Sequence, residues 1–126
     1  MPRAKRDCGR FDIRIDRNGG WHYRNSPINR KELVCLFASV LRREPDGSYL
    51  LETPVERGRI VVEDAPFVAV QMAVEGEGEG RSIAFRTNVD DLVQVGPEHP
   101  LRFEQDERGG VKPYVRVRGE LWARAT

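Results

Sequence analysis

The sequence lacks the residues from which catalytic and metal sites are usually built. It contains only two cysteines and two histidines among 126 residues, and Cys8 and Cys35 follow no metal-binding or redox spacing. His22 and His99 are isolated in the sequence, and no serine lies in a nucleophile-elbow pattern. A Ser–His–Asp or Cys–His arrangement would need chance convergence in the fold. We therefore expect no metal, no cofactor and no enzymatic activity.

An excess of charge of either sign is also missing. Lysine and arginine number 21 and aspartate and glutamate 20, for a net charge of +1. Proteins that bind nucleic acid through its phosphates usually carry a clear basic excess. Only residues 2–6 are locally basic, and we interpret them as a solvated terminus rather than a nucleic-acid arm. We expect no nucleic-acid partner.

Long hydrophobic runs are absent too. The longest apolar stretches are far shorter than a membrane span. The basic start is followed by Asp7 and Gly9 rather than by the apolar core of a signal peptide. The two cysteines permit one disulfide, but nothing calls for a secreted disulfide framework. The sequence therefore predicts a cytoplasmic protein without a membrane partner.

What is present is a succession of short strand patterns. Residues 11–16 and 21–24 alternate apolar and polar side chains around an Arg-Asn-Gly-Gly turn, which predicts a hairpin. Residues 67–74 are almost entirely apolar and predict a central strand. Residues 88–92 are expected to form either one helical turn or a tight polar loop. Further strands are predicted at 49–53, 59–63, 82–87, 92–95, 101–105 and 114–118.

One segment predicts an amphipathic helix. Asn29 can cap its N-terminus, and Glu32 stands three residues later, as in a capping box. Residues 44–47 are expected to end the helix. About nine short strands beside one helix define a β-rich α+β fold. The expected buried stripe of the helix consists of Leu33, Leu36, Phe37, Val40 and Leu41.

Two polar clusters lie at predicted strand ends. Glu63 and Asp64 end one strand, and residues 86–91 follow another. Polar side chains at strand ends can converge on a ligand while the sheet stays rigid. Asn and Asp also stabilise turns, so a purely structural role is the alternative.

The predicted pairing of two strands would bring polar residues together. If residues 67–74 and 82–87 form a hairpin, Pro66 and Thr87 lie at the same end of it. Arg14, which lies between two isoleucines on a predicted strand, is a third candidate for ligand binding. A solvated sheet face explains Arg14 nearly as well.

Six short motifs occur in a fixed order along the chain. They are FDIRI at 11–15, SPINRKELV at 26–34, LFASVL at 36–41, TPVERG at 53–58, VEDAPF at 62–67 and FRTNVDD at 85–91. Together they resemble the bacterial family called domain of unknown function 1285, and the similarity extends from about Cys8 to Leu121, nearly the whole chain. Family members commonly continue beyond the segment that matches residues 114–121, so this chain, which ends at Thr126, is expected to be either naturally short or truncated.

The resemblance implies a two-lobed, duplicated architecture, with an N-terminal lobe at residues 1–65 and a C-terminal β lobe at residues 66–126. The C-terminal lobe would be similar to pleckstrin-homology-like folds. The resemblance also implies a site for a nucleotide-like ligand at the interface between the lobes, and a role in signal transduction. The positions that match family motifs near this interface are Thr53, Glu56, Glu63, Asp64, Arg86, Thr87, Asn88 and Asp90.

These expectations favour a non-enzymatic ligand-sensing or regulatory module. Arg86 could pair with a phosphate, but the carboxylates of Glu63, Asp64 and residues 90–91 oppose an anion in the same region. The alternative is a protein–protein interaction adaptor without a small ligand, since open sheet edges suit strand addition. An enzyme that uses paired carboxylates is a third hypothesis, for which no nucleophile or positioned base is evident.

Overall fold

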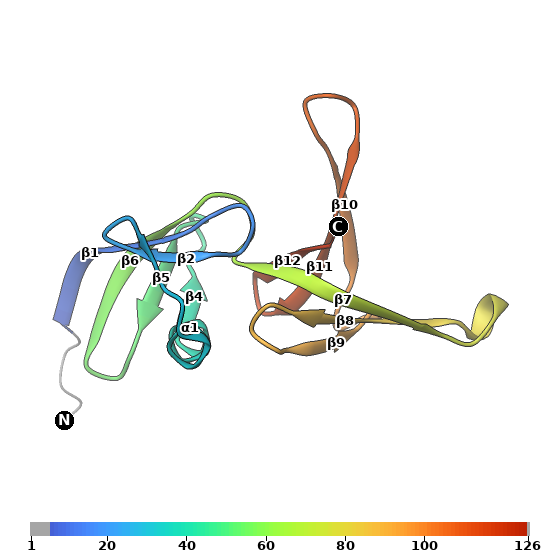
Figure 1. The fold of residues 1–126 in the computed structure, drawn as a ribbon, viewed down its shortest axis with the longest axis horizontal. Helices are drawn as coiled ribbons and strands as arrows, with labels where there is room; N and C mark the ends of the chain where they lie inside the picture. The colour runs from blue at the N-terminus through green and yellow to red at the C-terminus, as the bar shows by residue number, and fades with distance from the viewer. Residues whose placement is uncertain (1–5, 126) are drawn as a thin grey trace. The chain divides into compact units, whose positions relative to one another are not determined.

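The computed structural model describes residues 6–125, so residues 2–5 of the predicted basic tail lie outside the described part of the chain. The chain forms two compact units, Met1–Asp64 and Ala65–Thr126, and each unit contains its own six-stranded sheet. Within residues 6–125, one α-helix and one 3-10 turn accompany twelve strands (Figure 1). The predicted β-rich α+β class and the two-lobed organisation are confirmed.

The N-terminal sheet has the strand order β3-β2-β1-β6-β5-β4. Neighbouring strands are antiparallel except for the central pair, β1 and β6, which run parallel. The predicted first hairpin is β1–β2, in which Ile15 lies opposite Trp21. The strands are β1 (Arg6–Ile15), β2 (Trp21–Tyr23), β3 (Ser26–Pro27), β4 (Leu41–Arg43), β5 (Tyr49–Glu52) and β6 (Glu56–Val62).

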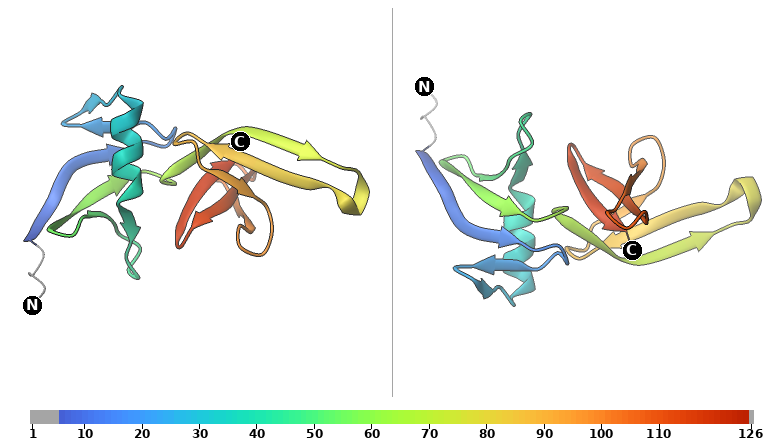
Figure 2. Two further views of the ribbon diagram at one scale, coloured as in Figure 1. Left: turned by 90° about the horizontal axis from the view of Figure 1, so that it is seen from below. Right: turned by 90° about the horizontal axis from the view of Figure 1, so that it is seen from above.

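The core of this unit lies between the sheet and α1 (Lys31–Ser39), which crosses the strands (Figure 2). Alternate strand residues point to one face, and those of β1 on the helix side, Ile13 and Ile15, are buried. Trp21 of β2 is also buried, and its ring stacks on that of Phe37 from the helix at a centroid distance of 6.1 Å.

The start of α1 differs from the prediction. Its N-cap residue is Arg30, which makes no side-chain cap hydrogen bond, so the predicted capping box of Asn29 and Glu32 was wrong. The reason lies in the preceding segment. Strand β3 pairs with β2, and the Ile28 backbone N–H donates to Trp21 O at 2.8 Å. This pairing delays the first helical residue to Lys31.

The end of α1 also comes earlier than expected. Leu41 is fully buried but belongs to β4, where it pairs with Leu51 of β5. Leu36 is 62% exposed, so the predicted five-residue buried stripe was wrong in part. Residues 44–47 form the turn between β4 and β5, in which Gly47 N–H donates to Glu44 O, rather than the end of a helix.

The C-terminal sheet has the strand order β10-β11-β12-β7-β8-β9. The predicted β7–β8 hairpin is confirmed, with Ala69 opposite Thr87. The 3-10 turn η1 (Gly78–Gly80) connects its strands. Residues 88–91 form a tight turn rather than a helix, and Leu92 already belongs to the next strand. The strands are β7 (Phe67–Glu75), β8 (Ser82–Thr87), β9 (Leu92–Gln94), β10 (Leu101–Gln105), β11 (Val111–Arg118) and β12 (Leu121–Ala125).

Strand β12 was not predicted, although it occupies the middle of the C-terminal sheet. It is antiparallel to β11 and parallel to β7. Leu121, Ala123 and Ala125 are buried and alternate with half-exposed residues. β7 is central only along Phe67–Ala69, its segment beside β12. The expectation of a central strand is therefore confirmed for residues 67–69, which are buried, and wrong for residues 70–74, which are exposed.

The two sheets share one topology. In each unit, two three-stranded antiparallel meanders meet at a parallel pair made by the first and last strands, β1·β6 and β7·β12. The connection between the two meanders contains α1 in the N-terminal unit. In the C-terminal unit the corresponding connection is residues 95–100, which contain no helix.

Candidate functional site

An apolar pocket lies between α1 and the sheet of the N-terminal unit. Its volume is about 220 Å³. Two of its lining residues are polar, Thr53 and Glu56, and both belong to the sequence-predicted site. The lining residues are Phe11, Ile13, Phe37, Val40, Leu51, Thr53 and Glu56.

A glycine in β6 makes room for one aromatic wall of this pocket. A Cβ atom added at Gly58 would lie 2.5 Å from the Phe11 ring, closer than any non-bonded carbon contact allows. The ring can therefore lie flat against the sheet only because position 58 has no side chain. Sequence reasoning missed the apolar lining of the pocket. A glycine inside a strand was the available signal, since it marks a close approach.

Thr53 fixes the turn that leads into β6. Its Oγ1 accepts hydrogen bonds from the backbone N–H groups of Val55 and Glu56, at 3.3 and 3.1 Å, and lies 3.2 Å from the Glu56 carbonyl oxygen, to which it can donate. This arrangement holds Glu56 at the pocket, where its side chain is partly buried.

The Glu56 carboxylate accepts a hydrogen bond from the Cys8 thiol, with Sγ and Oε2 3.4 Å apart. Partial burial and the neighbouring Glu56 carboxylate raise the pKa of the Cys8 thiol. A raised pKa disfavours the thiolate, which is the nucleophilic form. Cys8 therefore acts here as a hydrogen-bond donor to Glu56, and not as an activated nucleophile.

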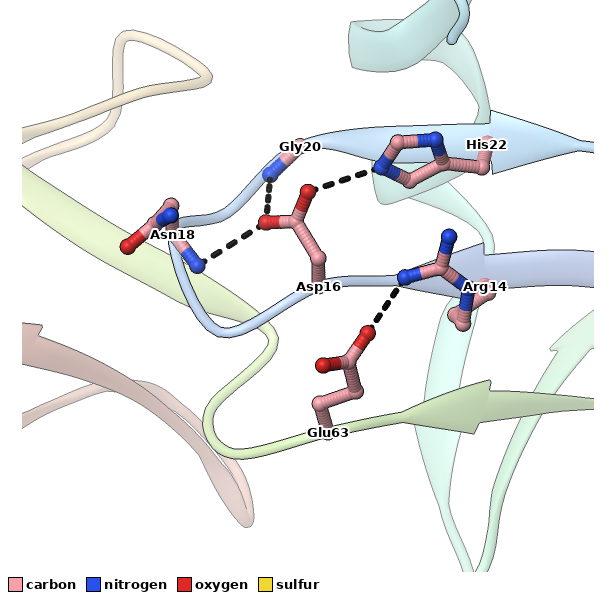
Figure 3. A network of polar contacts seen from close by, with 6 residues as sticks. All are labelled: Arg14, Asp16, Asn18, Gly20, His22 and Glu63. Atoms are coloured by element: carbon pink, nitrogen blue, oxygen red, sulfur yellow. Dashed lines mark hydrogen bonds and ion pairs between the residues drawn. The ribbon is translucent and has the colours of Figure 1, made fainter. Parts of the chain in front are cut away.

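A second polar group lies at the β1–β2 turn (Figure 3). Asp16 Oδ1 accepts the backbone N–H groups of Asn18 and Gly20, at 2.8 and 2.9 Å, and Asp16 Oδ2 lies 2.7 Å from His22 Nε2. Partial burial acts to raise the pKa of Asp16, but the hydrogen bonds from His22 and from the two backbone N–H groups outweigh it and lower the pKa. The carboxylate holds the turn closed.

The predicted site residue Glu63 lies near this turn. It follows β6, and its carboxylate forms an ion pair with Arg14 of β1 (Figure 3). Its backbone N–H donates to Ile15 O at 2.9 Å. Arg14 and Glu63, both predicted as candidates, are thus brought together as partners of each other. Asp64 is the last residue of the N-terminal unit.

The remaining four predicted residues surround the turn after β8. The Arg86 guanidinium donates to Gln71 Oε1 at 3.0 Å and to Asp90 Oδ1 at 2.9 Å. Thr87 is fully buried, and its Oγ1 accepts the backbone N–H groups of residues 89 and 91. Asn88 Oδ1 accepts the Val68 N–H at 3.0 Å. Each contact stabilises the turn, which carries Asp90 at a positive φ of 68°.

The eight predicted residues therefore fall into separate groups, each within one unit. Thr53 and Glu56 meet at the apolar pocket. Glu63 lies near the β1–β2 turn, and Asp64 follows it at the end of the N-terminal unit. The third group is the turn after β8, with Arg86, Thr87, Asn88 and Asp90.

A larger and more polar groove of about 340 Å³ lies in the same unit. Arg57 and Arg59 face three carboxylates there, and Arg57 lies 3.8 Å from Asp7. Hydrogen bonds from Ser48, assisted by the charge of Arg59, lower the pKa of Asp46. Because two guanidinium groups face three carboxylates, the groove carries a net negative charge and does not favour an anion. Its lining residues are Asp7, Gly9, Glu44, Pro45, Asp46, Leu50, Arg57, Gly58 and Arg59.

Residues 6–125 contain no group of three His, Cys, Asp or Glu side chains that could hold a metal ion. The helices in the same range are all too short or too polar to cross a membrane. Cys8 and Cys35 do not form a disulfide.

The fold and the pocket define a β-rich protein of two small lobes that repeat one sheet topology. The N-terminal half matches the family description "Domain of unknown function (DUF1285), N-terminal domain" over residues 4–65. The C-terminal half matches "Protein of unknown function (DUF1285), C-terminal domain" over residues 66–126. The chain belongs to the DUF1285 family.

Two solved structures of this family are similar to the chain. One, from Silicibacter pomeroyi DSS-3, has 43% sequence identity and a TM-score of 0.92, and the match covers 98% of this chain and 67% of that one. The other, from Shewanella baltica OS155, has 25% identity and a TM-score of 0.67, with 91% and 84% covered. No curated protein matches the chain.

Proposed function

We propose that the protein is a cytoplasmic, non-enzymatic ligand-sensing or regulatory module of bacterial signal transduction, and that it binds a nucleotide-like ligand in the N-terminal pocket. The observation that carries this proposal is the position of Glu56 and Thr53 on an otherwise apolar pocket of about 220 Å³. Small-molecule sites have this composition, with apolar walls and a few polar groups that orient the ligand.

The chemistry of the pocket suits a nucleobase better than a phosphate. Phe11 and Phe37 offer aromatic surfaces for a flat heterocycle, and the Glu56 carboxylate would accept a hydrogen bond from an amino group or a ring N–H. The same carboxylate repels an anion. An apolar cavity of about 150 Å³ can hold benzene. A pocket of about 220 Å³ therefore admits one ring system, and the sugar and phosphate would stay outside.

Two further parts of the proposal concern catalysis and the C-terminal unit. A non-catalytic role is supported by the raised pKa of the Cys8 thiol beside Glu56. We also propose that the C-terminal unit is a pleckstrin-homology-like lobe, which its mostly antiparallel six-stranded sheet supports. The Arg86 guanidinium already has two partners within its own unit. We therefore propose the N-terminal pocket as the ligand site and keep the Arg86 cluster as the alternative site.

A thermal-shift screen tests the proposal. The protein is titrated with purine and pyrimidine bases, nucleosides, nucleotides and cyclic nucleotides, each against wild type, Glu56→Gln and the control Glu104→Gln. Glu104 is an exposed carboxylate in the C-terminal unit. A ligand at 100 times its Kd adds about 2.7 kcal/mol of stability, which corresponds to several degrees. We expect this shift in wild type and Glu104→Gln, and its loss in Glu56→Gln.

The result also locates the ligand. Free bases and nucleosides should shift the wild type nearly as well as nucleotides, because the pocket takes the base. If only phosphorylated compounds act and Arg86→Ala abolishes their effect, the ligand binds the C-terminal cluster and the pocket assignment is wrong. If no compound shifts the wild type, the nucleotide proposal is wrong.

One observation favours the alternative function, a protein–protein interaction adaptor without a small ligand. Among residues 6–125, β12 pairs with β7 at Phe67–Ala69, and the apolar side chains of Val70, Met72 and Val74 are exposed. Open strand edges of this kind accept additional strands.

A further inference from the structure

The hydrogen-bonding capacity of the N-terminal pocket is concentrated in one carboxylate. Two of the lining residues, Thr53 and Glu56, are polar. The Thr53 hydroxyl accepts the backbone N–H groups of residues 55 and 56, and it can donate its own proton to the Glu56 carbonyl oxygen at 3.2 Å. The hydrogen bonds of Thr53 are therefore used within its own turn. Among the described residues that line the pocket, the Glu56 carboxylate is the polar side-chain group left to meet a ligand.

A carboxylate accepts hydrogen bonds and donates none. Its two oxygens can accept from two neighbouring N–H groups at once, as they do from the guanidinium of arginine. The Cys8 thiol, a weak donor, bonds to Glu56 Oε2 with a separation of 3.4 Å. Because each carboxylate oxygen offers about two acceptor positions, Glu56 retains the capacity to accept a pair of N–H groups from a ligand.

This carboxylate and one aromatic wall of the pocket lie next to each other on β6. Glu56 and Gly58 are two residues apart on the strand, so their positions share one face of the sheet, about 6.5 Å apart. The Phe11 ring covers Gly58. A flat ring stacked on Phe11 would therefore turn one edge toward Glu56. The hydrogen-bonding pattern of that edge decides which heterocycle fits.

We propose that the pocket selects heterocycles with a 2-amino-4-oxopyrimidine edge, which guanine and the pterins share. This inference rests on the proposed function and adds to it the chemical identity of the ligand. On this edge a ring N–H stands beside an amino group, so that two adjacent donors meet the two oxygens of Glu56. Adenine and cytosine place an acceptor nitrogen beside their amino group, and uracil flanks its ring N–H with two carbonyl oxygens. A carboxylate repels each of these acceptors.

Matched nucleosides test this selectivity without a change in the protein. Titration calorimetry of the wild type compares guanosine with inosine, which lacks only the 2-amino group, and with 1-methylguanosine, which lacks the ring N–H. We expect each analogue, and also adenosine and uridine, to bind about tenfold or more weakly than guanosine, because a hydrogen bond to a charged group is lost. Pterin carries the same edge without a sugar. Whichever of pterin and guanosine binds more tightly identifies the class of the ligand.

The variant Glu56→Gln tests the assignment to this side chain. A glutamine amide places one donor beside one acceptor, a pattern that matches adenine. We expect Glu56→Gln to weaken guanosine binding about tenfold or more and to leave adenosine binding no weaker than in the wild type. A pocket that was only loosened would lose both nucleosides together. The control Glu104→Gln, at an exposed position of the C-terminal unit, should keep the wild-type preference.

The possible results separate this inference from the proposed function. Equal binding of guanosine, inosine and adenosine to the wild type would overturn the selectivity and leave the pocket as a nucleobase site. A guanosine preference that persists in Glu56→Gln would overturn the role of Glu56. If no nucleoside and no pterin binds the wild type up to millimolar concentration, the inference and the proposed function are both wrong. Circular dichroism checks that Glu56→Gln is folded, and if it is not, the wild-type series with inosine and 1-methylguanosine decides.

Discussion

Asp16 in the β1–β2 turn and Asp106 in the β10–β11 turn close their turns with the same hydrogen-bond pattern, one in each unit. Each carboxylate accepts two backbone N–H groups, from residues 18 and 20 for Asp16 and from residues 108 and 110 for Asp106, at 2.7–2.9 Å. Only Asp16 also has a histidine partner, His22. A comparison of variants at Asp16 and Asp106 therefore separates two contributions to stability, that of the turn hydrogen bonds and that of His22.

Asp16→Asn should lower stability in a pH-dependent way. The pKa of Asp16 lies below its ordinary value of 3.8. A carboxyl with a lowered folded-state pKa adds stability above its unfolded value and loses that contribution as the pH falls through the folded value. We expect Asp16→Asn to cost about 1–2 kcal/mol at neutral pH, with the difference shrinking below about pH 4. Urea unfolding across this range measures it.

The control for this experiment is Asp106→Asn, which removes the same turn carboxylate where no histidine lies beside it. The loss in Asp16→Asn should exceed the loss in Asp106→Asn at neutral pH. Equal losses in the two variants would show that His22 contributes nothing measurable.

Gly58→Ala should destabilise the N-terminal unit. The added Cβ would meet the Phe11 ring at 2.5 Å, and overpacking of this kind typically costs about 1–3 kcal/mol. Gly96→Ala is the control, because nothing lies within 4 Å of its Cβ position. Denaturant midpoints of the two variants measure the difference. A neutral Gly58→Ala would mean that Phe11 moves away freely, and the pocket would then lack a fixed wall.

At the scale of elements, α1 begins without a side-chain cap, which leaves a simple route to greater stability. Arg30 occupies the N-cap position with extended backbone angles, and Ser is strongly preferred there because its hydroxyl accepts a free helix N–H. We expect Arg30→Ser to add about 0.5–1 kcal/mol to the free energy of unfolding. Asn29→Ala should change little, and a loss as large as 1 kcal/mol in urea titration would restore Asn29 as the cap.

The sequence predicted most strands and the pairing within hairpins, but not the pairing between strands distant in sequence. Alternating side chains identified the β1–β2 hairpin, and a continuous apolar run identified β7 of the β7–β8 hairpin. β12 escaped prediction, since a short run with Trp122 and Arg124 at alternate positions has little apolar bias. Its burial comes from β7 and β11 on either side, which are contacts distant in sequence. The helix limits failed for a related reason, because pairing of Leu41 with Leu51 overrode the helical period.

The candidate site was predictable only in part. Thr53 and Glu56 were selected through the family motif, and they do border a pocket. The apolar walls of the pocket include Phe11 and Phe37, and their pattern in the sequence is that of ordinary core residues. Apolar periodicity predicts that a side chain faces the interior, but it does not predict whether a cavity remains beside that side chain. Whether a packed face closes depends on the volumes of side chains from several elements, which no single pattern contains.

At the scale of the whole molecule, every strand pairing among residues 6–125 lies within one unit. This organisation predicts that residues 1–64 and 65–126 each fold when produced alone. Domains of this size rarely exceed about 3–5 kcal/mol in stability, so each fragment should unfold cooperatively at low denaturant. Circular dichroism and amide proton dispersion measure the folding of each fragment. A fragment that stays unfolded alone and folds only when mixed with the other would contradict the prediction, because its sheet would then need support from outside its own half of the chain.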